Sequence, residues 1–180
     1  TIPNDSTSGA AFNQEGTHVI LDATTSGLCR GFMVGMYGKT NTATIEGGTL
    51  NCTWLDVGRS DQNGGNGTLT VSEGQITIAN YLNIPTQFST QVDPNNLGHG
   101  HLNLLGGTIS VPTLHIGNGQ TGANGGVGIL HITNGTLILN GDKTTQIQDY
   151  ITEGKITTMA PNTFQVDFDD TNAGKTTITA

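Results

Sequence analysis

The sequence predicts an all-β solenoid, in which the chain winds into stacked coils of three short strands each. Apolar residues alternate with polar ones over short runs, for example in residues 67–78 and 128–139, and this alternation is typical of half-buried strands. A marker glycine recurs in each unit at a spacing of about 30 residues, at Gly48, Gly74, Gly107 and Gly135. Because three short strands cannot bury an apolar face alone, the units must stack on one another.

The repeats divide the 180 residues into parts of one domain, residues 1–180. Residues 1–16 carry few apolar positions and are expected to be a lead-in. Residues 17–140 hold about five repeated coils. The period is lost over residues 141–180, where we expect a C-terminal cap, because the open end of a solenoid is a sheet edge that aggregates.

The composition excludes several classes of partner. The formal net charge is −8, with only six Lys and Arg residues, whereas nucleic acids and anionic membranes require clustered positive charge. No run approaches the roughly 20 apolar residues of a membrane helix. No secretory signal is visible, so the chain has the character of a mature region cut from a larger protein. Neutral partners are favoured.

The two cysteines occupy matching positions. When the repeats are aligned, Cys29 and Cys52 lie at the same inward position of neighbouring coils. Strands in a sheet are about 4.8 Å apart, within the Cα separation of a disulfide. A disulfide would indicate an oxidising, exported setting. The other interpretation is two small buried apolar residues.

Aromatic residues give the best indication of a binding site. Trp54 and Tyr81 align at one outward position in consecutive coils, between Gly31 and Thr113. Two neighbouring rings could offer apolar faces to a sugar, although both could instead fold back as packing. The polar residues expected to bind sugar hydroxyls beside them are Asp56, Arg59, Asp61 and Asn83.

The sequence gives no sign of catalysis. The aligned columns Met33, Asp56, Asn83, His115 and Glu46, Ser72, Leu105, Thr133 do not place two acids together. Glycosidic cleavage needs a pair of carboxylates, so we expect a protein that is not an enzyme and has no catalytic cofactor. Asp167 and Asp169 alternate along the chain as oxygen ligands of calcium do, which makes them candidates for a structural calcium site.

The repeat pattern Gly-x-Leu-x-Val-x-x-Gly-x-Ile-x-Ile, followed by Leu-x-Ile-Gly, covers residues 28–140 approximately. It resembles the repeats of exported bacterial right-handed parallel β-helix proteins. In size and format the chain is similar to carbohydrate-binding module family 89, whose β-helical modules are attached to xylanases. This resemblance implies a right-handed parallel β-helix that is secreted or displayed on a bacterial surface. It also implies binding to xylan and a tethered catalytic domain as partner.

These observations together favour a non-catalytic module that binds a neutral plant polysaccharide, xylan by preference, and targets an attached glycoside hydrolase to it. The alternative is a structural or adhesive β-helix segment of a bacterial surface or autotransporter-like protein. A polysaccharide lyase or hydrolase is disfavoured, because the sequence shows no clusters of acids and bases.

Overall fold

The computed structural model describes residues 9–12, 18–21, 26–36, 38–59, 64–85, 97–117 and 126–180. The elements in chain order are β1 (Gly9–Phe12), β2 (His18–Leu21), β3 (Ser26–Val34), β4 (Thr40–Val57), β5 (Asn66–Ile84), β6 (His99–Leu104), β7 (Thr108–Val111), β8 (Thr113–Ile116), β9 (Val127–Ile132), β10 (Thr136–Asn140), α1 (Thr144–Thr152), β11 (Ile156–Thr157), β12 (Gln165–Phe168) and β13 (Lys175–Thr179).

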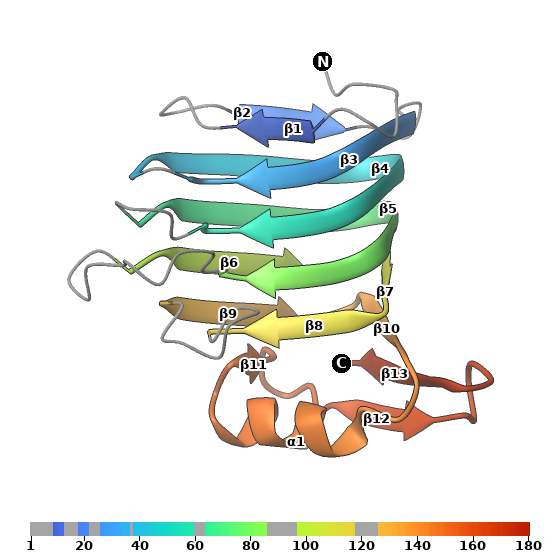
Figure 1. Cartoon of the computed structure of the whole chain (residues 1–180). Helices are drawn as coiled ribbons and strands as arrows, with labels where there is room; N and C mark the ends of the chain where they lie inside the picture. Colours follow the sequence, from blue (N-terminus) through green and yellow to red (C-terminus); the bar gives the residue numbers. More distant parts are fainter. Residues whose placement is uncertain are drawn as a thin grey trace.

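All of these strands belong to one mixed, largely parallel sheet. Its main path runs through eight strands in the order β1-β3-β4-β5-β7-β10-β13-β12, and the sheet curls into a half-barrel. Figure 1 shows successive strands stacked from the N-terminal to the C-terminal end of the molecule. The last two strands of the path pair antiparallel, both β10 with β13 and β12 with β13.

The predicted right-handed parallel β-helix, or β-solenoid, of about five coils with three short strands per coil is therefore wrong. The repeat glycines were expected to break each unit into separate strands at sharp corners. Instead β4 and β5 continue for 18 and 19 residues. Register shifts near Glu46 and between Cys52 and Trp54 bend the paired strands without ending them, as β-bulges do. The result is a curled sheet in which the long strands β4 and β5 pair with short strands such as β2, β6, β7 and β8.

The register between neighbouring strands agrees with the alignment of the repeats. Trp54 pairs with Gly31 on one side and with Tyr81 on the other, and Tyr81 pairs with Thr113. Asp56 likewise lies between Met33 and Asn83. These columns of outward residues follow from the two-residue period of a strand, because a slip by one residue would turn every apolar side chain outward.

The core lies inside the curl and is almost entirely aliphatic. Alternate residues of β4 and β5 are buried, so one face of the sheet is dry. Its largest fully buried side chains are Phe32, Ile45, Leu50, Leu55, Leu69, Ile76, Leu82, Ile84, Leu102, Leu104, Ile109 and Leu114. Burying such side chains is the main favourable contribution to folding, at roughly 1.5–3 kcal/mol each.

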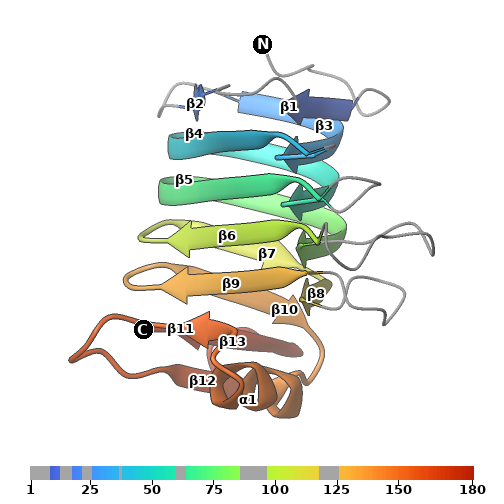
Figure 2. The same ribbon diagram turned by 90° about the vertical axis from the view of Figure 1, so that its left-hand side faces the viewer.

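The C-terminal segment covers the last edges of the sheet, as Figure 2 shows at the lower end of the molecule. β11 pairs parallel with β9, and β13 pairs antiparallel with β10. The helix α1 lies along the edge of β8, where the amide nitrogen of Gln146 donates to the carbonyl of Leu114 at 2.9 Å. Backbone groups that would otherwise invite another strand are thereby satisfied. No helix of the described residues is long and apolar enough to cross a membrane.

Candidate functional site

The candidate site lies on the outer surface of the front wall, which we define as β8 and the last residues of β3, β4 and β5. These segments face the viewer in Figure 1. Along them inward residues such as Leu55 and Leu82 are fully buried, whereas Trp54 and Tyr81 have the opposite parity and are half-buried. Strand periodicity therefore carries the two rings to the surface.

Trp54 and Tyr81 form an aromatic platform. Their rings are nearly parallel, with an interplanar angle of 13°, and the ring centroids are 6.4 Å apart. The two rings are stacked across the neighbouring strands β4 and β5, at a separation near the upper limit for aromatic pairs.

Gly31 provides the floor of this platform. A Cβ atom on Gly31 would be 2.1 Å from Cζ2 of Trp54 and 2.3 Å from both of its ring neighbours. Near-equal distances to three consecutive ring atoms place that position above the face of the ring, not beyond its edge. One face of Trp54 thus rests on the backbone of Gly31, where a side chain would stand. The absence of a side chain at this residue lets the indole lie flat on the sheet.

A polar cluster follows two residues further along the same strands. The Nδ2 of Asn83 donates to Oδ1 of Asp56 at 2.7 Å, and both residues are fully buried. Nη1 of Arg59 is 3.8 Å from Oδ2 of Asp56 and donates to the sulfur of Met33 at 3.3 Å. A buried carboxylate needs such partners, because leaving it uncompensated would be very costly.

This cluster changes the roles expected for the predicted polar residues. Asp56 and Asn83 do not reach the surface, so they hold the end of the front wall together instead of presenting groups to a ligand. Arg59 keeps 19% of its side chain exposed and lies at the rim of the site. Asp61, the remaining predicted residue, lies outside the described residues.

The column of paired residues that contains Asp56 and Asn83 continues to His115 of β8, which pairs with Asn83. This imidazole is partly covered, and the loss of hydration lowers its pKa from the ordinary value. Burial disfavours the charged form of a base, which explains the direction. His115 therefore adds a neutral donor and acceptor to the wall rather than a positive charge.

The structure does pair two acids, contrary to the expectation from the sequence. A register shift after Ile45 places Glu46 opposite Glu73 instead of Ser72. Both glutamate side chains are exposed. A glycosidase needs one carboxyl group held in a desolvated environment, so that it stays protonated and acts as the acid. Two solvated carboxylates on an open surface do not provide it.

The predicted calcium ligands are used in a turn. Both carboxylate oxygens of Asp167 accept hydrogen bonds from Thr171, at 3.1 Å from its N–H and 2.9 Å from its hydroxyl. Asp169 accepts a hydrogen bond from the N–H of Gly174. The two residues thus shape the connection from β12 to β13. In the described part of the chain, no three His, Cys, Asp or Glu side chains are grouped to hold a metal ion.

The two cysteines are register partners, as the sequence alignment indicated. In the structure Cys29 and Cys52 are buried thiols and do not form the predicted disulfide. A hydrogen bond with Cys29 and burial both raise the pKa of the Cys52 thiol above its ordinary value. In this state the pair packs as part of the core.

Sequence reasoning missed a second surface feature, a groove along α1. Eight residues of the segment from Asp142 to Lys155 line it, and its volume is about 560 Å³. The sequence left residues 147–156 open between a short helical turn and a closing strand, because only nine residues are helical and only Ile147 is buried among them. A single buried residue gives too weak a 3.6-residue period to be read from the sequence.

Comparison with known proteins adds no family to this description. No protein-family model, no curated protein and no solved structure matches the chain.

Proposed function

We propose that this chain is a non-catalytic module that binds a neutral polysaccharide on the front wall. The observation that carries the proposal is the aromatic platform of Trp54 and Tyr81, two stacked and half-buried rings on an outward surface. Flat apolar rings fit the C–H faces of sugar rings. Their edges leave room for the hydroxyl groups to reach polar neighbours such as Arg59 and His115.

The chemistry of the surroundings supports a neutral ligand. The net charge of −8 repels polyanions, and Arg59, the cationic residue at the rim, is engaged by the buried carboxylate of Asp56. Xylan is the preferred ligand because of the resemblance to xylanase-associated modules. In this proposal the chain belongs to an exported bacterial protein and raises the local concentration of substrate for a tethered glycoside hydrolase.

Affinity electrophoresis tests the proposal directly. The full chain is run through gels containing soluble xylan, β-glucan or mannan, as wild type and as Trp54→Ala. We expect retardation by xylan and a loss of at least about tenfold in affinity for the variant, because buried aromatic anchors dominate binding energy. Phe168→Ala is the matched control, since Phe168 is another exposed ring, on β12 far from the platform.

Each outcome has a clear meaning. Retardation that is lost in Trp54→Ala and kept in Phe168→Ala supports the proposed site. Retardation that is unchanged in Trp54→Ala would still support a binding module, but it would exclude the aromatic platform as the binding site. No retardation of the wild type by any glycan would contradict the proposal and favour the alternative, a structural segment of a surface protein.

A further inference from the structure

The groove along α1 adjoins the wall that carries the aromatic platform. From Trp54 the outward column passes to Tyr81 and then to Thr113 of β8. The next element is α1, because Gln146 contacts the carbonyl of Leu114 at 2.9 Å. Figure 1 shows α1 directly below β8 on the same side of the molecule. One strand, β8, therefore separates the platform from the groove. The distance across the sheet from β4 to β8 is about 10 Å, because they are two strand spacings apart.

The helix is fixed in this place by contacts with the edge of β8. The hydroxyl of Tyr150 accepts a hydrogen bond from the N–H of Ile116 at 3.4 Å, and Gln146 donates to the same hydroxyl at 3.3 Å. Ile147 is fully buried beneath the helix. Because these contacts hold the middle of the helix against β8, the groove is preformed rather than dependent on a moving segment.

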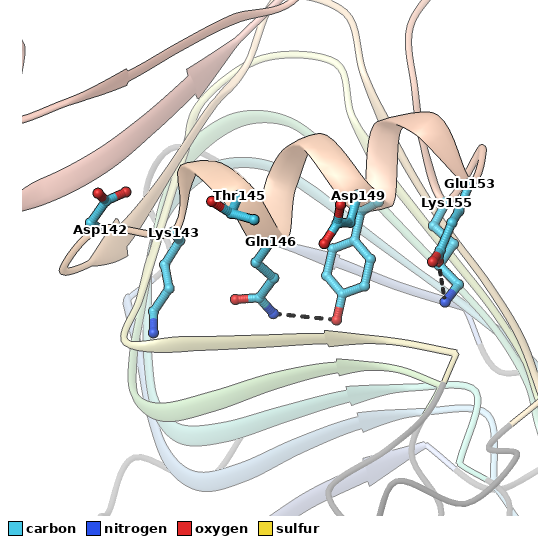
Figure 3. A pocket seen from close by; sticks show the side chains of 8 residues that line it. Asp142, Lys143, Thr145, Gln146, Asp149, Glu153 and Lys155 are labelled. Carbon is cyan, nitrogen blue, oxygen red and sulfur yellow. Dashed lines mark hydrogen bonds and ion pairs between the residues drawn. The ribbon is translucent and has the colours of Figure 1, made fainter.

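The groove is polar, and charges of both signs line it. Figure 3 shows three carboxylates and two ammonium groups along α1, with the amide of Gln146 between them. Nζ of Lys155 is already 2.7 Å from Glu153 and 5.4 Å from the centroid of the Tyr150 ring. Asp142 is likewise engaged by Thr144, which donates to it from its N–H and its hydroxyl. The internal pairing leaves no concentrated charge for an ionic ligand.

Among the described residues that line the groove, three have polar groups available to a ligand. Lys143 offers a donor, Asp149 offers acceptors, and Gln146 keeps an amide oxygen that points away from its dashed hydrogen bond in Figure 3. Closely spaced donors and acceptors match hydroxyl groups, which both donate and accept. A volume of about 560 Å³ lies within the usual range for small-molecule sites.

We propose that the α1 groove is a further subsite of the glycan surface, which takes the sugar units of a neutral chain that extend beyond the platform and across Thr113. This inference rests on the proposed function and adds a direction to it. The polysaccharide runs across the strands, from β4 toward α1, and not along them. Short oligosaccharides then occupy the platform alone, and longer ones occupy both places.

Calorimetric titration with xylotriose and xylohexaose tests this subsite. The variants are Lys143→Ala and Asp149→Ala in the groove, Trp54→Ala in the platform, and Asp170→Ala as an exposed acid on the C-terminal hairpin. We expect each groove variant to bind xylohexaose about tenfold more weakly, since hydrogen bonds to charged groups are lost. Their affinity for xylotriose and that of Asp170→Ala should equal the wild-type values.

Protection from acetylation gives an independent readout on the wild type. Xylohexaose should slow the modification of Lys143, whereas xylotriose should not, and Lys39, an exposed residue that directly precedes β4 and does not line the groove, serves as internal control. If both groove variants bind xylohexaose as tightly as the wild type while Trp54→Ala loses affinity, the subsite is refuted and the platform remains the proposed binding site. Absence of binding to the wild type would overturn the proposed function and the subsite together.

Discussion

Replacing Gly31 by alanine should displace the ring of Trp54 without unfolding the sheet. The new Cβ would be 2.1 Å from Cζ2 of the indole, whereas non-bonded carbon atoms prefer about 3.6 Å. The ring must therefore move by about 1.5 Å. It can do so, because the clash involves the far end of a side chain and no backbone atom.

The free energy of unfolding should change little in this variant. Alanine costs less conformational entropy than glycine in a strand, a gain of about 0.5–1 kcal/mol. The indole loses part of its contact with the sheet, which offsets this gain by a similar amount. We expect a net change within about 1 kcal/mol.

Gly67→Ala is the matched control, because Gly67 is also a strand glycine but faces backbone. A Cβ there would be 2.0 Å from the carbonyl oxygen of Val34. That oxygen accepts the N–H of Gly58 at 2.8 Å, so the strands must separate and the hydrogen bond weakens. We expect a loss of about 3 kcal/mol in the free energy of unfolding.

The single tryptophan makes the assay simple. In Gly31→Ala the emission of Trp54 should shift to longer wavelength and acrylamide should quench it more strongly, while urea unfolding stays near wild type. Retardation by xylan should fall, since the platform is disrupted. Unchanged fluorescence, or a loss of stability as large as that of Gly67→Ala, would refute the placement of the indole over Gly31.

Three further predictions follow from charges and thiols. Glu73→Lys should stabilise the protein by about 0.5 kcal/mol in urea unfolding, because it replaces repulsion with Glu46 by attraction; a gain that persists at high salt would contradict this cause. Oxidised glutathione should convert Cys29 and Cys52 to a disulfide and raise stability by about 3 kcal/mol. Thiol counts and the intact mass measure the conversion, with Cys52→Ser as control. Because the pKa of Cys52 is raised, the oxidation should be slow and should become faster as the pH increases. For His115 the folded-state pKa is lowered, so the unfolded chain takes up the proton first and stability should fall as the pH drops below about 6.5. His115→Asn should flatten that part of the pH profile, and an equally steep profile in the variant would assign the proton uptake to other groups.

The periodicity of the sequence was sufficient to predict the strand register. Aligning the repeats placed Trp54 beside Tyr81 and Cys29 beside Cys52, and the structure has both pairs. The reason is that a strand with one buried face tolerates no slip by a single residue. Parity also put Trp54 on the outward surface, because Leu55 next to it is an obligatory core residue.

Tertiary structure decided what the same pattern could not show. Glycines such as Gly48 read as corners, yet bulges absorb them within continuous strands, so the sheet curls instead of dividing into coils. One of these bulges changes the register partner of Glu46 from Ser72 to Glu73. The alternation of apolar residues does not predict this shift.

Burial of outward residues was equally invisible to the sequence. Asp56 and Asn83 have the parity of surface residues, yet both are buried. Two interactions allow this, the hydrogen bond from Asn83 to Asp56 and the ion pair of Asp56 with the guanidinium of Arg59. The groove along α1 arises because the edge of β8 needs hydrogen-bonding partners and Gln146 provides one. Local periodicity thus determined which residues are neighbours, whereas burial and edge capping depend on contacts between segments far apart in the chain.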